Sequence, residues 1–187
     1  MVLVAIIGGA VIALGLGTIF VLSLAEASLL AVSDITMRRL ADQGNRRAAV
    51  VLQLKASDQF LSTIIVGVNA SVILVSTVMT LLVERSLGEG AQWQAEAWHI
   101  ATILVILVLS EITPKTWGAL MPEPLALAVA PIIQRLVVLT SPVVRALTLV
   151  SNALLRGNAA DVVPRPHFIT AKEIQAAADI GEEEGVV

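Results

Sequence analysis

The sequence predicts an all-α integral membrane protein, and its composition and long apolar segments are the observations that predict it. Of the 187 residues, 57% are hydrophobic and 14% are charged, and the mean hydropathy is +0.88. A soluble domain of this length carries more charge than this. Three segments are long and apolar enough to cross a bilayer as helices. They cover about residues 2–30, 60–83 and 97–113.

The composition also excludes several classes of function. The net charge is −3 and no basic cluster is interleaved with aromatic residues, so we expect no nucleic-acid partner. The chain has no cysteine and only two histidines, which argues against disulfides and transition-metal centres. No nucleophile paired with a base, phosphate-binding loop or redox centre is recognisable, so we expect that the protein is not an enzyme.

The first span is rich in glycine, which allows membrane helices to approach each other closely. It is followed by a polar connection, residues 36–58, whose apolar positions fit short amphipathic helices at the membrane surface with a turn at Gly44–Asn45. This connection carries five Lys or Arg residues, so it should be cytoplasmic. The N-terminus is then expected outside the cell membrane and the C-terminus in the cytoplasm.

The second span carries Ser62, Asn69 and Ser76 at seven-residue spacing, so these polar side chains share one face of a helix. The short loop that follows, residues 84–96, contains a single basic residue, Arg85, and is therefore expected outside.

The third span carries Glu111 in an otherwise apolar run. An ionisable residue inside a span is costly and is a candidate functional residue. Pro114 has no N–H, so in an α-helix the Ser110 carbonyl, four residues earlier, would lose its partner. The alternative interpretation is a carboxylate that reaches the inner interface and pairs with Lys115, four residues further on. The sequence leaves both readings open.

Polar residues of all three spans fall in the inner half of the bilayer when depth is counted at about 1.5 Å per residue. The first span brings Ser23 and Glu26, the second Asn69 and the third Glu111. Hydroxyl, amide and carboxylate oxygens suit Mg²⁺, Na⁺ or H⁺ and not a soft metal. For the serines taken singly, hydrogen bonding between helices is the simpler explanation.

The remaining segments are predicted to lie outside the bilayer core. Residues 119–158 are apolar but contain Pro131 and Pro142, so we expect juxtamembrane helices, two in number, along the inner face; a re-entrant hairpin is the alternative. Residues 169–187 begin with a capping-box pattern and end in three glutamates. They predict an acidic amphipathic helix, the start of an acidic helical bundle that we expect to continue beyond this chain.

Several motifs together resemble the transmembrane domain of CorC-type bacterial magnesium transporters and eukaryotic cyclin-M proteins. The segment Ser110-Glu111-Ile112-Thr113-Pro114-Lys115 is similar to that family's Gly-Glu-Ile-x-Pro-Lys. The sequence departs from the family pattern at Gly67-Val68-Asn69 and at Val72, where the family often has further Asn residues. The other matching segments are residues 20–29, 44–48, 60–67, 169–174 and 182–186.

The resemblance implies three transmembrane helices, juxtamembrane helices and a homodimer that exports Mg²⁺, with Na⁺ as a candidate coupling ion. It implies a Mg²⁺ site built from Ser23 and its helix, the Asn69 region and Glu111, with Ser71 as a substitute for the missing Asn. It also implies that ATP binds only to a C-terminal pair of CBS domains that this chain does not contain. The candidate ligands are Ser23, Glu26, Ser28, Asn69, Ser71 and Glu111.

Two other functions compete with Mg²⁺ transport at this stage. The protein could transport another cation, with Glu111 and Glu26 as Na⁺ or proton sites. It could also be a membrane scaffold or a haemolysin-like protein without transport activity, since relatives have carried that label. Stabilisation by an ion would distinguish a transporter from a scaffold.

Overall fold

The computed structural model of the protein describes residues 2–87 and 92–155. All regular structure in this part of the chain is helical, which confirms the prediction of an all-α fold. The chain divides into two units, Met1–Leu147 and Thr148–Val187, and the description below concerns the first. The predicted acidic helix at residues 169–187 lies outside the described residues. The helices are α1 (Val2–Ala31), α2 (Asp34–Asp42), α3 (Arg46–Lys55), α4 (Asp58–Leu87), α5 (Gln92–Val105), the π-helical segment η1 (Ile106–Ile112), α6 (Thr113–Leu120) and α7 (Pro122–Leu155).

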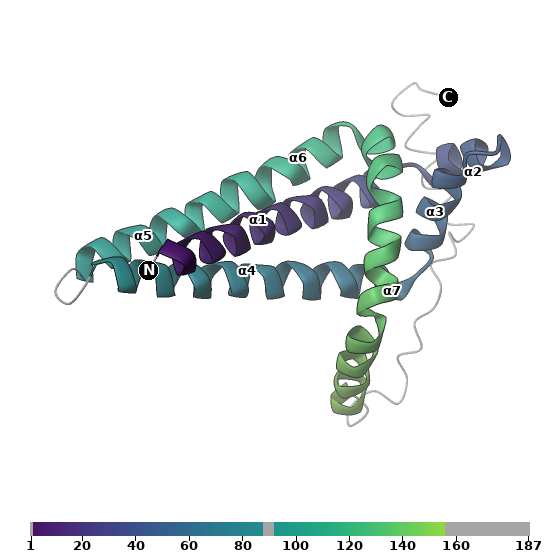
Figure 1. The fold of residues 1–187 in the computed structure, drawn as a ribbon. Coiled ribbons are helices and arrows are strands. Elements are labelled where there is room, and N and C mark those ends of the chain that lie inside the picture. The colour runs from purple at the N-terminus through teal and green to yellow at the C-terminus, as the bar shows by residue number, and fades with distance from the viewer. Residues whose placement is uncertain (1, 88–91, 156–187) are drawn as a thin grey trace, which may run out of the picture. The chain divides into compact units, whose positions relative to one another are not determined.

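Three long rods run side by side in the first unit (Figure 1). They are α1, α4, and the nearly continuous α5–η1–α6, and α1 packs against both of the others. The third rod runs in the same direction as α1, whereas α4 runs in the opposite direction (Figure 1). Four helical stretches are long and apolar enough to cross a membrane: Val2–Ala31, Gln59–Ser86, Glu96–Leu120 and Pro122–Val150. The three predicted spans fall within the first three stretches, and the fourth was not predicted as a span.

Glycines set the close contact between α1 and α4. A methyl group placed on Gly8 would lie 2.8 Å from the Leu82 side chain, so the two helices already touch at this level. The same test at Gly15 meets Val75 of α4. Small residues at such crossings allow the side chains of one membrane helix to contact the backbone of the other. This is the role that the glycines of the first span were predicted to have.

Two short helices, α2 and α3, connect α1 to α4. Ser33 caps α2 by accepting a hydrogen bond from the Thr36 N–H, and Asn45 caps α3 by accepting hydrogen bonds from two backbone N–H groups. Between the helices, Gly44 has a φ of 90°, a left-handed conformation that glycine adopts without strain. The turn therefore stands at Gly44–Asn45, where the sequence places its turn residues.

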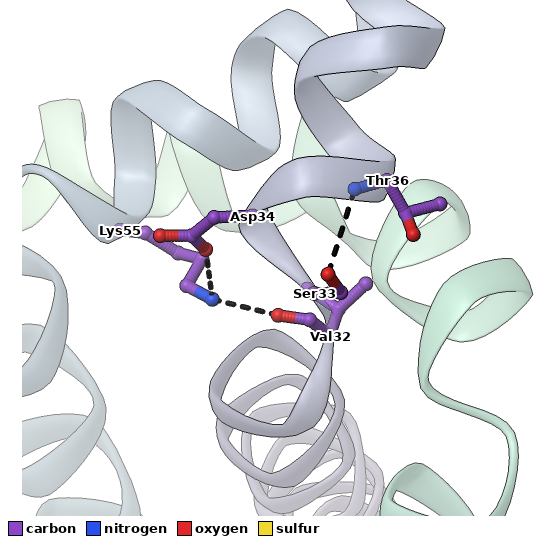
Figure 2. A network of polar contacts seen from close by, with 5 residues as sticks. All are labelled: Val32, Ser33, Asp34, Thr36 and Lys55. Carbon is purple, nitrogen blue, oxygen red and sulfur yellow. Dashed lines mark hydrogen bonds and ion pairs between the residues drawn. The ribbon is translucent and has the colours of Figure 1, made fainter. Parts of the chain in front are cut away.

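Lys55, at the end of α3, ties this connection to the end of α1 (Figure 2). Its ammonium group donates to the Val32 carbonyl at 2.8 Å and forms an ion pair with Asp34. A cation is favourable next to the last carbonyls of a helix, because the helix dipole is negative there. The junction between the span and the connection is thus held by one charged side chain that is only 21% exposed.

The structure contradicts the expectation of two helices, or a hairpin, after the third span. α7 is one continuous helix from Pro122 to Leu155, with Pro131 and Pro142 inside it. A proline removes one hydrogen bond and can bend a helix without ending it, so packing can hold the helix together across both prolines. The packing is visible in the core, where α7 buries one face in the same cluster as α1, α3 and α4. That face consists of Ala126, Val129, Ala130 and Ile133.

Within the first unit, α7 runs across α1 and α4 instead of beside them (Figure 1). Two observations place it near the α2 end of the bundle. Ala126 and Ile133 share a core cluster with Leu29 of α1 and Phe60 of α4. Thr140 lies 3.4 Å from Thr63, oxygen to oxygen. That α7 lies along the inner membrane face stays a prediction.

Candidate cation site

The contacts between helices fix which residues lie at the same level of the bundle. In addition to the contacts at Gly8 and Gly15, a methyl group on Gly67 of α4 would lie 2.8 Å from the Leu22 side chain of α1. Because α1 and α4 are antiparallel, Ser23, the next residue after Leu22, lies close to the level of Gly67. Ser23 therefore lies near a level at which α1 and α4 approach each other closely through a glycine of α4.

Ser23 is the most informative residue of the predicted set. It is fully buried, and its Oγ is the buried side-chain oxygen of the described residues that has no hydrogen-bond partner. A buried hydroxyl without a partner costs about 1–3 kcal/mol. Ser28, one turn further along α1, is also buried, but its hydroxyl lies 3.4 Å from the Ala25 carbonyl. Of these two serines, Ser23 is the one whose hydroxyl lacks any hydrogen-bond partner among the described residues.

The part of the third rod that contains Glu111 is a π-helix and not an α-helix. Residues Ile106–Ile112 form a π-helix, in which a carbonyl pairs with the N–H five residues later. Both the N–H and the hydroxyl of Thr113 donate to the Val108 carbonyl. The residue five before Pro114 is Leu109, so its carbonyl lacks a π-type partner in addition to the α-type partner that Pro114 denies to Ser110. Segments of π-helix occur often at functional sites.

The ion pair of Lys115 sets the level of Glu111. Lys115 Nζ lies 3.1 Å from Glu26 Oε2 of α1, and not beside Glu111. Just beyond it, a methyl group on Gly118 would lie 2.9 Å from the Leu24 carbonyl oxygen. Because α1 and α6 run in the same direction, one turn back along both helices brings Glu111 to the neighbourhood of Ser23.

Glu111 is therefore not the partner of Lys115, which was the competing explanation for its carboxylate. It is half-buried, and within residues 2–87 and 92–155 its carboxylate makes no hydrogen bond or ion pair. Ser110 beside it is 3% exposed. Ser110 was not among the predicted ligands, although it precedes the carboxylate directly in the sequence.

The residues predicted on α4 are placed less favourably. Asn69 is exposed, and its amide nitrogen donates to the Ile65 carbonyl of its own helix at 2.8 Å. Ser71 is half-buried and lies one turn beyond Gly67. Glu26 is engaged with Lys115. The structure thus brings Ser23, Ser110 and Glu111 to about one level. Of the other predicted ligands, Glu26 is paired with Lys115 and Asn69 is exposed, and Ser28 and Ser71 lie nearby.

The chemistry of this level is that of a hard cation. Among the described residues no group of three or more His, Cys, Asp or Glu could hold a metal ion. A cation here would therefore rest on one carboxylate, serine hydroxyls and backbone carbonyls. Hydroxyl and carbonyl oxygens with one carboxylate are ligands of Mg²⁺ or Na⁺, and Mg²⁺ commonly keeps several of its waters.

The fold and this polar level define a class of protein: a multi-pass α-helical membrane protein. Between its helices, the described residues include a carboxylate without an ion pair and a buried hydroxyl without a hydrogen-bond partner. A family profile described as "Cyclin M transmembrane N-terminal domain" matches residues 9–187. The chain therefore belongs to the cyclin M transmembrane-domain family, as its motifs predict.

Individual relatives agree with this assignment. The UPF0053 inner membrane protein YfjD of Escherichia coli is 32% identical over 132 residues, 70% of this chain and 30% of the relative. The UPF0053 protein sll0260 of Synechocystis is 29% identical over 85% of this chain and 36% of its own length. A second Synechocystis protein, sll1254, is 30% identical over 88% of this chain and 45% of the relative. The chain thus spans less than half the length of these relatives.

Proposed function

We propose that this protein is the membrane domain of a Mg²⁺ transporter that exports the ion, with Na⁺ as the candidate coupling ion. The observation that carries the proposal is that, within the described residues, the buried Ser23 hydroxyl and the Glu111 carboxylate lie at about one level and neither has a partner. A buried hydroxyl and a carboxylate within a span are both costly unless something compensates them. A cation that passes between α1 and η1 would compensate both at once. We expect that the protein catalyses no reaction.

The proposed ligands are Ser23 and Glu111, with Ser110 as an addition from the structure. Asn69 is exposed, and its amide nitrogen donates to the Ile65 carbonyl of its own helix, so its Oδ1 would have to turn toward the site to join them. Ser71, Ser28 and Glu26 lie about one turn away, and Glu26 would have to release Lys115. These four residues are better placed to line the route by which the ion enters and leaves than to coordinate the ion at the site.

A transporter for a monovalent cation is the second candidate, and one observation favours it. Glu111 is the carboxylate at this level that has no partner among the described residues, and a single carboxylate neutralises one positive charge. Na⁺ or a proton would therefore balance the charge fully, whereas Mg²⁺ would retain one positive charge that water and hydroxyl oxygens must stabilise.

Reconstituted full-length protein should distinguish these functions. In liposomes loaded with a Mg²⁺-sensitive dye, we expect a Mg²⁺ flux that depends on the protein. This flux should increase when a Na⁺ gradient drives Na⁺ across the membrane in the opposite direction. A Na⁺ or proton flux that is unchanged by Mg²⁺ would support the monovalent transporter instead. Liposomes with neither flux would count against a transporter and favour a scaffold.

The proposed assembly is a two-fold homodimer in the cell membrane, the commonest closed symmetry. Its orientation follows from charge. Because Arg38, Arg39, Arg46, Arg47 and Lys55 lie between α1 and α4, this connection should face the cytoplasm.

Labelling of single cysteines should confirm this orientation. The chain has no cysteine of its own, so Gln43→Cys and Gly90→Cys each introduce a single thiol into it. Gln43 is exposed next to the Gly44 turn, whereas Gly90 lies outside the described residues. In intact cells that carry the full-length protein without other cysteines, an impermeant thiol reagent should label Cys at position 90 and spare position 43. The reverse pattern would show that the orientation is wrong.

A further inference from the structure

A groove of about 640 Å³ lies between α1 and α7 in the first unit. Its volume is within the range of small-molecule binding sites. The α1 wall includes Leu14, Gly17 and Thr18, and the α7 wall includes Ile132, Arg135 and Leu139. Neither Ser23 nor Glu111 lines the groove, although Leu22, the neighbour of Ser23, does.

The lining is apolar except for two groups. The Thr18 hydroxyl donates to the Leu14 carbonyl at 2.8 Å, so its proton is already in use. Arg135 is exposed and makes no hydrogen bond or ion pair within the described part of the chain. A methyl group placed on Gly17 would meet no atom within 4 Å, so the groove reaches down to the backbone of α1.

The surroundings of the groove indicate what fills it. Leu14 is 73% exposed and Leu139 is 75% exposed, and both lie on helices that are apolar enough to cross a membrane. We therefore expect the open side of the groove to face lipid chains, which match its apolar walls. A guanidinium without a partner is costly in such a place, and a phosphate group is the partner that it binds best, through two parallel hydrogen bonds. Basic pockets between membrane helices bind anionic headgroups in this way.

We propose that the groove binds an anionic phospholipid, with one acyl chain over Gly17 and the phosphate on Arg135. The single charged side chain among the apolar lining residues is complementary to the single anionic head of such a lipid. The proposal is independent of cation transport, because neither wall contains a proposed ligand.

Native mass spectrometry of the full-length protein in a mild detergent tests the charge. Phosphatidylglycerol and phosphatidylcholine with identical acyl chains are added at equal concentration. The unmodified protein should retain phosphatidylglycerol in preference to phosphatidylcholine. Arg135→Gln should weaken phosphatidylglycerol binding about fivefold, whereas Arg145→Gln, an exposed arginine on α7 that does not line the groove, should leave it unchanged. Equal retention by the unmodified protein and Arg135→Gln would overturn the proposal.

A second pair of variants tests the apolar channel. Gly17→Leu should fill the groove and release both lipids, whereas Gly9→Leu, also in open space on α1 but not part of the groove, should release neither. If Gly17→Leu changes the number of protomers in the complex, a second copy of the chain covers the groove and the lipid proposal fails. Displacement of the lipid by equimolar inorganic phosphate would also overturn the proposal, because the groove would then bind an anion and not a phospholipid. Because Arg135 is exposed, its variant keeps the proposal testable if Gly17→Leu does not fold.

Discussion

Replacement of Glu111 by Gln is expected to abolish the stabilisation of the protein by Mg²⁺. An ion that binds only the folded state adds about 2.7 kcal/mol to the free energy of unfolding at a concentration of 100 times Kd. The amide keeps the shape of the side chain but removes the charge that attracts the ion. The melting temperature of the purified full-length protein, measured with and without Mg²⁺, should therefore rise by several degrees for the unmodified protein and hardly at all for Glu111→Gln. Mg²⁺ flux in liposomes should disappear with it.

Two further variants make this prediction specific to the site. Glu123→Gln, the same change at an exposed position on α7, should leave the Mg²⁺ effect intact. Ser23→Ala should have opposite effects on the stability of the protein without Mg²⁺ and on its further stabilisation by Mg²⁺. Without Mg²⁺ it should stabilise the protein by about 1 kcal/mol, because it removes a buried hydroxyl that has no partner. With Mg²⁺ it should gain less than the unmodified protein. If Glu111→Gln retains the full Mg²⁺ stabilisation and flux, the carboxylate is not a ligand.

Gly118→Ala is expected to destabilise the protein strongly, by about 1–3 kcal/mol, as overpacking does elsewhere. The added methyl group would lie 2.9 Å from both the Leu24 carbonyl oxygen and the Ser28 backbone nitrogen of α1. These are backbone atoms that no rotamer change can move away. Helix α6 would have to shift away from α1, which would also separate Lys115 from Glu26.

The matched control is Gly17→Ala on α1, where the methyl group meets no atom within 4 Å. Helix propensity favours Ala over Gly, so this variant should be unchanged or slightly more stable. Thermal unfolding monitored by circular dichroism in the same detergent compares the two. Equal melting temperatures for both variants would show that the contact between α1 and α6 is looser than the structure indicates.

The sequence alone determines the membrane class, the course of three spans and the family. These properties depend on local quantities: the length of an apolar run, the place of Lys and Arg along the chain, and motifs such as Ser110–Lys115 that are continuous in sequence. The presence of Glu111 in a span, and therefore the choice of Glu111 as the central candidate, comes from the same local information.

The partners of those residues were decided only by the tertiary structure. Lys115 is four residues from Glu111 in the sequence, yet it pairs with Glu26, because the glycine contact at Gly118 brings α1 and α6 together at that level. The same holds for Ser23, whose hydroxyl has no hydrogen-bond partner among the described residues because of how three helices pack around it.

The continuity of α7 and the π-helical winding of η1 have a related physical cause. Pro131 and Pro142 looked like helix ends because each proline removes a hydrogen bond, a local cost that the sequence shows. The sequence does not show the interaction that offsets this cost, which is a buried face of α7 that packs on α1, α3 and α4. Pro114 likewise marks a disturbed segment, but the change from four-residue to five-residue pairing at Val108 appears only in the folded chain. Local costs can be read from a sequence, whereas the contacts that outweigh them come from residues far away in it.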